Sequence, residues 1–298
     1  MDILLTGSTG FLGTIIYKEL SEVNNIISLA RKKADINVDL STTIPSFERK
    51  LDLVIHSAGK AHSVPLNPEQ VKEFFDVNVQ GTSNLLDALS ACNPLPKSFT
   101  LISSVAVYGI DKGENISEDS PLLAQDAYGA SKIKAEQLVT DWCLKNNVIC
   151  TILRLPLIAG PNAPGNLGAM IKGINGGYYF NIAEGNAQKS IVLATDVANI
   201  IINASAVGGV FNLTDREHPS FKQLAQIIST QLGKSSPKNI PFYLAKVIAF
   251  FGDLLGNKAP INSSKLNKIV NNLTFNDSKA VSVLGWKPNR VLSNLKIK

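Results

Sequence analysis

The stretch DILLTGSTGFLG, residues 2–13, constrains the fold more than any other part of the chain. A short apolar run typical of a buried strand is followed directly by three glycines in the spacing GxxGxxG, and then by apolar residues at helical spacing. In such a turn the first glycine permits a tight bend, the second lets the backbone approach a pyrophosphate, and the third lets the helix pack close to the strand. The turn therefore predicts a dinucleotide site, with a strand-to-helix turn that binds nothing as the alternative.

Apolar strands alternate with helical patterns through the first half of the chain. Strands are expected at 3–6, 26–30, 51–59, 98–104 and 148–156, and helices at 11–22, 68–92 and 128–146. This alternation is typical of a parallel sheet that helices cover on both faces. The predicted fold class is α/β, with a Rossmann-type doubly wound parallel sheet and a smaller C-terminal α/β substrate lobe.

The chain changes character after Pro156. Residues 159–168 are dense in glycine, proline and asparagine and are expected to form a loop, after which short strands mix with helices near 220–232 and 241–256. We expect residues 1–160 to form a dinucleotide-binding Rossmann domain, to which the chain returns near 188–215. Residues 161–187 and 216–298 are expected to form the smaller, substrate-binding lobe.

Composition and charge argue against several functions. The chain has 298 residues, 45% of them hydrophobic, and its formal charge of +5 includes no basic block interleaved with aromatic residues, so no nucleic-acid surface is expected. Cys92, Cys143 and Cys150 show no CxxC spacing and are expected to be reduced thiols, and no signal peptide opens the chain. We therefore predict a cytoplasmic protein. No metal site is expected, because the spacing of His56 and His62 does not favour a pair of metal ligands.

The segment IPFYLAKVIAFFGDLLG, residues 240–256, is the most apolar candidate for a membrane span. It is shorter than the roughly 20 residues that cross a bilayer, and Lys246 and Asp253 interrupt it, so no integral membrane segment is expected. We expect a partly buried helix, with a helix lying on a membrane surface as the alternative.

The end of the second expected strand bears on the choice of cofactor. In NAD-binding proteins with this turn, an acidic residue about 20 residues downstream holds the ribose 2′-hydroxyl, whereas a nearby arginine accommodates the 2′-phosphate of NADP. The sequence here is SLARKK, with Arg31 at the corresponding place and no acidic residue. This favours NADP(H); a solvated basic turn, with NAD(H) as the cofactor, remains the alternative.

Two polar motifs fall where such a sheet binds its ligands. In YGASK, Tyr128 and Lys132 lie four residues apart on an expected helix, so both project from one face. An adjacent ammonium lowers the pKa of a phenol, which can then give or take a hydroxyl proton while a hydride moves at the same carbon. Ser104 ends the strand at 98–104, at the carboxyl edge of the sheet, where its hydroxyl can bond a substrate oxygen.

The sequence as a whole resembles the extended short-chain dehydrogenases/reductases of the NAD-dependent epimerase/dehydratase family, which act on nucleotide sugars. Within that family it is similar to UDP-sugar 4-epimerases and to reductases of UDP-4-keto-6-deoxy-N-acetylhexosamines. The pieces that carry the resemblance occur in family order along nearly the whole chain: TGSTGFLG at 6–13, VDL at 38–40, HSAG at 56–59, NVQGT at 78–82, SSVAVYG at 103–109, YGASK at 128–132, RLPLIAGP at 154–161, TDVA at 195–198 and LGWKP at 284–288.

The resemblance implies residue roles. Tyr128 would be the catalytic acid/base, Lys132 its helper on the nicotinamide ribose, and Ser104 the third catalytic member. In the loop GPNAPGNLG, Asn166 would touch the nucleotide sugar, and Lys189 would meet its diphosphate as a point charge where many members have an arginine. The implied cofactor-binding residues are Gly7, Gly10, Phe11, Leu12 and Gly13 at the pyrophosphate, Arg31, Asp39 and Leu40 at the adenosine, and Ala58, Gly59, Asn78, Tyr128, Lys132 and Pro156 along the rest of the dinucleotide.

The predicted function is NAD(P)-dependent hydride transfer at C4 of a nucleotide-activated hexose, which the resemblance makes UDP-linked. The absence of an acidic residue near Arg31 and the loop around Asn166 favour a 4-keto-sugar reductase, and a 4-epimerase with the same machinery is the alternative. A non-catalytic redox sensor is a further alternative, although such relatives typically lack the tyrosine or the lysine. The hypothesis of a lipid-linked sugar or steroid substrate rests on residues 240–256 alone. A homodimer is expected only because it is usual in the family.

Overall fold

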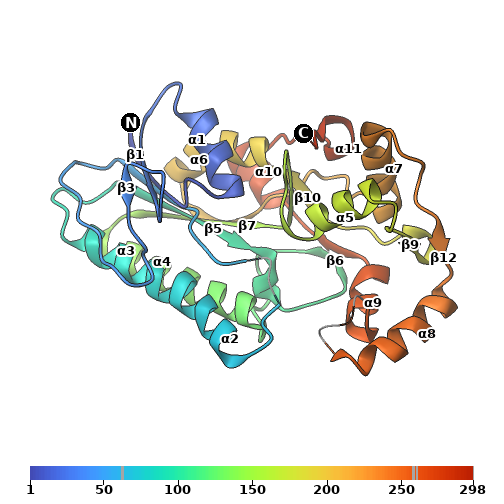
Figure 1. Cartoon of the computed structure of the whole chain (residues 1–298). Helices are drawn as coiled ribbons and strands as arrows, with labels where there is room; N and C mark the ends of the chain where they lie inside the picture. Colours follow the sequence, from blue (N-terminus) through green and yellow to red (C-terminus); the bar gives the residue numbers. More distant parts are fainter. Residues whose placement is uncertain (62–63, 257–258, 260, 298) are drawn as a thin grey trace.

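The computed structural model describes residues 1–61, 64–256, 259 and 261–297, and its centre is a sheet of seven parallel strands (Figure 1). The chain runs outward in both directions from the middle pair, β1 and β4, so the sheet is doubly wound and a ligand crevice is expected at the carboxyl ends of these strands. From one edge to the other the strands are β11 (Gly209–Asn212), β7 (Ile149–Leu155), β5 (Ser98–Ser104), β4 (Leu53–His56), β1 (Asp2–Thr6), β2 (Asn25–Ala30) and β3 (Ile36–Asn37).

Helices cover both faces of this sheet (Figure 1). The side chains of β1 alternate between the faces: Ile3 and Leu5 belong to one buried cluster and Leu4 to the other, as the two-residue period of a strand requires. The predicted α/β fold is therefore confirmed. One face carries α1 (Phe11–Leu20), α6 (Ala194–Val207) and α10 (Ser278–Leu284), and the other carries α2 (Pro68–Phe75), α3 (Gly81–Ser90) and α4 (Ala127–Asn146).

The rest of the chain forms a smaller α/β lobe beside the carboxyl edge of the sheet (Figure 1). Three two-stranded parallel sheets join distant segments within it, pairing β8 with β10, β9 with β12 and β6 with β13. The elements are β6 (Gly113–Ile116), β8 (Leu157–Ala159), α5 (Gly165–Asn175), β9 (Asn181–Ile182), β10 (Ile191–Leu193), α7 (Phe221–Leu232), β12 (Asn239–Ile240), α8 (Phe242–Asp253), α9 (Ser263–Val270), β13 (Leu273–Phe275) and α11 (Val291–Asn294).

Some sequence expectations for this region need correction. The loop expected at 159–168 is shorter, because α5 begins at Gly165, directly after Pro164 at the N-cap, and buries Leu167. Of the two strands in the segment 188–215, where the chain was expected to return to the Rossmann domain, β11 joins the large sheet and β10 pairs with β8. The division of the chain into two domains at residue 160 stays a prediction. No helix among the described residues is long and apolar enough to cross a bilayer.

A buried ion pair connects α4 to the sheet. Arg154 on β7 and Glu136 on α4 are joined by a 2.8 Å contact from Nη2 to Oε2, and only 6% and 5% of their side chains are exposed. Ser103 Oγ donates to Glu136 Oε1 at 2.5 Å, and Arg154 Nη1 donates to the Tyr108 hydroxyl at 3.2 Å. Because each charge is also hydrogen-bonded to neighbouring polar groups, the pair is stable away from water and holds α4 against β5 and β7.

We predict that Arg154→Met lowers the free energy of unfolding by about 3–5 kcal/mol, because the Glu136 carboxylate would stay buried without its partner. Urea unfolding monitored by circular dichroism measures the loss. The double variant Arg154→Met/Glu136→Leu should recover a large part of it, because neither charge is then left alone. Lys72→Met, which breaks the exposed pair with Asp76, is the control and should cost less than about 1 kcal/mol. An Arg154→Met variant as stable as this control would contradict the prediction.

Candidate active site

The glycine turn is built by close backbone packing. Gly7 has φ of +69°, and a Cβ at this position would lie 2.6 Å from the amide nitrogen of Ala58, so a side chain is excluded. A Cβ at Gly13 would collide with the carbonyl oxygen of Gly7. The Gly7 amide donates to the Leu29 carbonyl at 2.8 Å, which fixes the turn against β2. Packing alone therefore explains the first and the third glycine.

Gly10 differs from the other two glycines because the space beside it is open. The only atom within 4 Å of a Cβ there, its immediate neighbours aside, would be the Gly7 carbonyl oxygen, at 3.2 Å. Gly10 is also the N-cap of α1, which has neither a side-chain cap nor an acidic residue in its first turn. The first amide groups of α1 can thus receive an anion, and the open backbone gives a pyrophosphate room to approach. The turn therefore fits a dinucleotide.

The two residues after Gly10 have their side chains committed to packing. Leu12 is buried in the cluster between α1 and the sheet. Phe11 reaches toward the smaller lobe, where a Cβ at Gly160 would lie 3.3 Å from its Cζ. Any contact of these two residues with a phosphate would therefore be made by their amide groups.

The end of β2 presents Arg31, exposed to solvent. The Ser41 hydroxyl donates to the Asp39 carboxylate at 2.6 Å, and this hydrogen bond is the main cause that lowers the pKa of Asp39. The nearby charge of Arg31 lowers it further. The nearby Asp35 is turned back to Ser28, whose hydroxyl donates to it at 2.7 Å. Leu40 is buried.

Asn78 joins the loop after β4 to α4. It lies in a π-helical turn, Asp76–Gln80, between α2 and α3 and is only 2% exposed. Its Oδ1 accepts from the Lys60 amide at 2.7 Å, and its Nδ2 donates to the Ser131 hydroxyl at 2.9 Å. A Cβ at Gly59 would lie 3.2 Å from Asn78 Oδ1 and 3.7 Å from Lys132 Nζ. Residues from three distant segments, all expected to bind the dinucleotide, therefore meet at one place.

The Tyr128 and Ser104 side chains lie close enough to each other for the serine to lower the pKa of the phenol. Gly129 makes this contact possible, because a Cβ there would lie 2.7 Å from the Ala106 carbonyl oxygen and would push α4 away from the turn that follows Ser104. Asp126 caps α4, and its Oδ1 accepts from the Tyr128 amide at 3.1 Å. Serine and tyrosine thus lie together at the carboxyl edge of the sheet.

The ionisation of Tyr128 differs from the sequence expectation. Burial raises the pKa of Tyr128, the hydrogen bond with Ser104 lowers it less, and the Asp126 carboxylate raises it further. The ammonium of Lys132 donates at 2.7 Å to the Ile102 carbonyl. Burial lowers the pKa of Lys132 to about 8, partly offset by Glu136. In the protein without ligands, therefore, Tyr128 is a neutral phenol.

The three remaining predicted residues come from other segments of the chain. Pro156 follows the carboxyl end of β7 and is half-buried, and Asn166 is exposed in the first turn of α5. Lys189 Nζ donates to the carbonyl oxygens of Lys268 and Asn271, both at 2.9 Å, at the end of α9. Burial lowers the pKa of Lys189 to about 8.

Sequence reasoning missed several residues that hold this site together. The sequence pattern indicates Gly129 only as part of the motif YGASK, and it gives Ser131 and Glu136 no role. Glu136 could have been found by extending the helical spacing, because it lies one turn beyond Lys132 on the same face of α4.

His56 is a core residue. Its Nδ1 lies 2.7 Å from the Thr6 hydroxyl and its Nε2 lies 2.9 Å from the Thr82 hydroxyl. Burial lowers the pKa of His56 to about 3, so the ring is neutral at physiological pH. His62 lies outside the described residues. No group of three or more potential metal ligands occurs among the residues that the structure describes.

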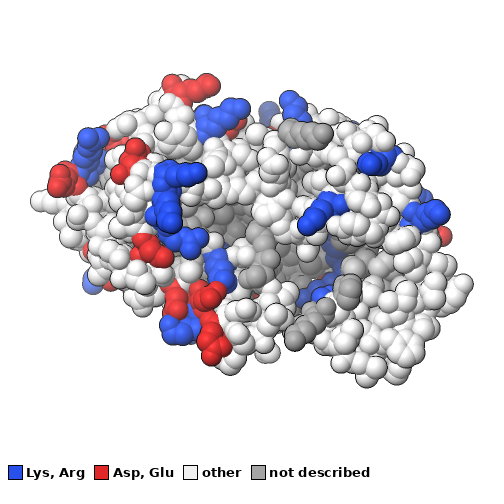
Figure 2. Space-filling view, in the orientation of Figure 1, with Lys and Arg blue, Asp and Glu red and all other residues white. Residues whose placement is uncertain are grey.

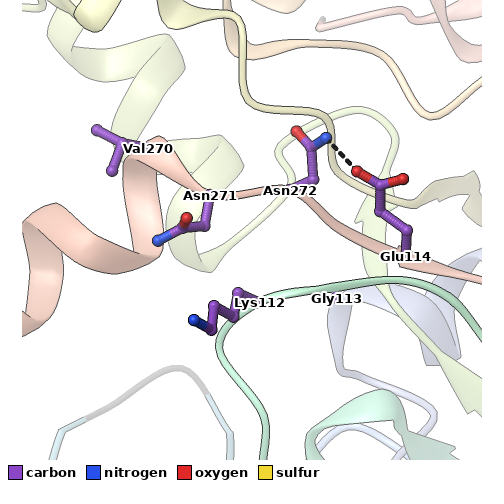
Figure 3. A pocket seen from close by; sticks show the side chains of 6 residues that line it. All are labelled: Lys112, Gly113, Glu114, Val270, Asn271 and Asn272. Carbon is purple, nitrogen blue, oxygen red and sulfur yellow. Dashed lines mark hydrogen bonds between the residues drawn. The ribbon is translucent and has the colours of Figure 1, made fainter.

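Figure 2 shows a hollow between the two halves of the molecule, with basic side chains along its rim. A separate cavity of about 480 Å³ lies between the start of β6 and the end of α9 (Figure 3). At its edge Asn272 Nδ2 donates to Glu114 Oε1 at 2.7 Å. This cavity includes neither Tyr128 nor the glycine turn, so it is distinct from the cluster described above.

Comparison with known proteins gives matches along nearly the whole chain. It is 27% identical to N-acetyl-alpha-D-glucosaminyl-diphospho-ditrans,octacis-undecaprenol 4-epimerase of Escherichia coli O157:H7, over 94% of this chain and 89% of that protein. It is 26% identical to UDP-glucose 4-epimerase of Vibrio cholerae, over 97% and 92%. The solved structure of UDP-glucuronic acid 4-epimerase from Bacillus cereus, in complex with UDP-glucuronic acid and NAD, has a TM-score of 0.75 at 19% identity, covering 98% and 96%.

The fold of the chain is thus that of known sugar-nucleotide epimerases. Residues 3–213, well over half of the chain, match the NAD dependent epimerase/dehydratase family. This segment contains the glycine turn, Ser104, Tyr128 and Lys132. The protein is therefore an enzyme and belongs to the NAD dependent epimerase/dehydratase family.

Proposed function

We propose that the enzyme transfers a hydride at C4 of a sugar carried on a diphosphate, with Tyr128 as acid/base. One observation carries this proposal: the Tyr128 and Ser104 side chains lie close enough for the serine to lower the pKa of the phenol, at the carboxyl edge of the sheet. Lys132 lies one helical turn beyond Tyr128, and the open glycine turn lies at the same edge of the sheet, after β1. A sugar hydroxyl in contact with both side chains would also lie beside the cofactor.

The dinucleotide would lie along the residues that converge at this edge. The amides at the start of α1 would hold its pyrophosphate, Asp39 and Leu40 its adenine end, and the Gly59–Asn78 contact its path toward Tyr128. Pro156 would lie beside the nicotinamide end of the dinucleotide. When bound, the nicotinamide supplies or accepts the hydride. The described residues fit this group, because Gly10 leaves open space that a side chain would fill.

The protein's own part in the reaction is proton transfer. A neutral Tyr128 donates its hydroxyl proton to the oxygen at C4 as a carbonyl is reduced, and the Tyr128 phenolate takes a proton from the C4 hydroxyl as an alcohol is oxidised. Ser104 holds that oxygen through its hydroxyl. If the Lys132 ammonium moves from the Ile102 carbonyl toward the Tyr128 hydroxyl, its positive charge favours the phenolate form of Tyr128.

A 4-epimerase is the first candidate for the overall reaction. The relatives from Escherichia coli and Vibrio cholerae, which match along most of both chains, are both 4-epimerases. A 4-keto-sugar reductase is the second candidate. It is favoured by exposed Arg31 and by the carboxylate of Asp35, which is turned away to Ser28. An exposed arginine at this place suits NADPH, a cofactor that a reductase exchanges at each turnover.

The group that carries the sugar is a separate choice. A UDP-sugar is the first candidate, since the Vibrio cholerae relative is a UDP-glucose 4-epimerase. A sugar diphosphate attached to a polyprenol is the second, since the Escherichia coli relative acts on such a lipid. One structural observation favours the second candidate: α8 exposes large apolar side chains.

We predict that the protein interconverts UDP-N-acetylglucosamine and UDP-N-acetylgalactosamine when NAD is present, without net formation of NADH. A parallel incubation with UDP-4-keto-6-deoxy-N-acetylhexosamine and NADPH tests the reductase. Chromatography of the sugars and absorbance of the reduced cofactor measure the two reactions. Cofactor consumption with the keto sugar, and no isomer in the first incubation, would reject the epimerase in favour of the reductase.

Tyr128→Phe tests the catalytic role of the tyrosine in either reaction. It removes only the phenolic oxygen, so turnover should fall by about 10²–10⁴-fold while cofactor binding changes little. Tyr178→Phe makes the same change at an exposed tyrosine and should leave turnover unaltered. Full turnover by Tyr128→Phe would remove the catalytic assignment.

We predict that the enzyme binds NADPH more tightly than NADH, because Arg31 faces solvent beside the end of β2. Arg31→Ala should weaken NADPH binding about tenfold and leave NADH binding nearly unchanged, as expected for the loss of a charged hydrogen bond to the 2′-phosphate. Fluorescence titration of both cofactors gives the dissociation constants. Lys33→Ala is the control at the same turn. Tighter binding of NADH by the unaltered protein would overturn the preference.

We predict that Lys132 makes folding stability depend on pH in the alkaline range. Its pKa is about 8 in the folded protein and 10.5 in an ordinary lysine, so above pH 8 the unfolded chain holds a proton that the folded chain has lost. Stability should therefore rise from pH 8 toward 10.5 relative to Lys132→Met. Urea midpoints across this range measure the difference. Lys134→Met, at an exposed site on the same helix, is the control, and parallel profiles for all three proteins would contradict the prediction.

A further inference from the structure

Helix α8 turns its large apolar side chains away from the protein. The residues it buries are small, namely Ala245, Ala249 and Gly252. Gly252 packs so closely that a Cβ there would collide with the Ile261 carbonyl oxygen. The partly buried helix expected from the sequence is therefore buried only along a narrow strip. Its exposed side chains, together with the two residues that follow, are Phe242, Tyr243, Leu244, Val247, Ile248, Phe250, Phe251, Leu254 and Leu255.

These exposed residues form one continuous apolar surface. With 3.6 residues per turn, positions 243, 247, 250 and 254 lie along one stripe, and positions 244, 248, 251 and 255 lie along the next. Both stripes lie away from the strip of small residues. In Figure 1 the helix lies at the outer corner of the smaller lobe, and in Figure 2 that corner shows neither acidic nor basic side chains. A surface of this extent is unusual for a side of a protein that contacts only water.

The segment of the chain that contains α8 carries almost only positive charges. Residues 234–270 contain six lysines and a single acidic residue, Asp253. Both oxygens of the Asp253 carboxylate accept hydrogen bonds from Ser263, one from its amide and one from its hydroxyl. On the helix itself, Lys246 lies over the Phe242 ring, 5.0 Å from its centroid. Such a lysine can keep its charged end in water while its stem lies along apolar surface.

We propose that α8 docks this enzyme on the surface of an anionic lipid bilayer. Aromatic and aliphatic side chains on one broad face, with lysines beside them, are typical of helices that lie in the membrane interface. A second copy of the chain explains the surface less well, because pairing two copies through α8 would bring the lysines beside the two surfaces toward each other. Anionic headgroups complement the lysines, and the acyl boundary takes up the apolar stripes.

Docking through α8 would hold the α9 side of the smaller lobe close to the membrane. Helix α9 packs on α8, and its C-terminal end is bonded to Lys189, beside the strand β10. The same end of α9 borders the cavity at the start of β6. The proposal does not depend on the reaction, because bilayer binding needs neither cofactor nor sugar.

The test is sedimentation of the full-length protein with lipid vesicles, without substrate or cofactor. The protein should pellet with vesicles that contain phosphatidylglycerol and much less with vesicles of phosphatidylcholine alone. The triple variant Val247→Gln/Phe250→Gln/Leu254→Gln should reduce the bound fraction about tenfold or more. The matched control, Val23→Gln/Leu123→Gln/Leu144→Gln, alters equally exposed apolar residues elsewhere and should bind like the unaltered protein.

Three outcomes would overturn the proposal. The unaltered protein could stay in the supernatant with both kinds of vesicle, or both triple variants could bind equally well. Light scattering could instead reveal a dimer that only the α8 variant dissociates, which would assign the surface to a second copy. Thermal unfolding reports whether each variant is folded. If one variant fails to fold, the binding of the unaltered protein to the two types of vesicle still tests the proposal.

Discussion

The ion pair between Glu136 and Arg154 is the interaction on which the geometry of the candidate site depends. Two charges so deeply buried are tolerated only when both are hydrogen-bonded on all sides, which restricts the distance and the rotation of α4 relative to β5 and β7. Lys132 lies one turn and Tyr128 two turns before Glu136 on the same face of α4. Fixing the carboxylate therefore fixes both residues, and Gly129 lets the first turn of α4 reach Ser104.

The two titratable groups of the site are each set by the protein around them. The Lys132 ammonium is bonded to a main-chain carbonyl of β5, and burial keeps Tyr128 protonated. The Lys132 ammonium also lies close to the loop after β4, since a Cβ at Gly59 would lie 3.7 Å from its Nζ. A ligand placed beside Gly59 would compete for this ammonium. Cofactor binding would then set the proton affinity of the tyrosine.

The sequence predicted the fold well because the fold depends on local patterns, and the proposed catalytic group was found from patterns of the same kind. The glycine turn, the apolar strands and the four-residue spacing of Tyr128 and Lys132 are each visible within a short segment. The Glu136–Arg154 pair and the contact of Asn78 with Ser131 join segments far apart in the chain, and no local pattern indicates them. The sequence also could not predict which face of α8 is buried. Apolar residues nearly encircle this helix, and the strip that is buried consists of alanine and glycine.

The position of Lys189 has a consequence for how the enzyme distinguishes its substrates. Its ammonium donates to two carbonyl oxygens at the C-terminal end of α9, groups that a helix cannot satisfy by itself. The side chain thus serves as a helix cap supplied from another part of the chain. While both bonds hold, this cation is not free to face a diphosphate. Under the proposed function, other parts of the lobe would then recognise the UDP or polyprenol diphosphate that carries the sugar. The Lys189 ammonium, which could have distinguished these two carriers, instead caps α9.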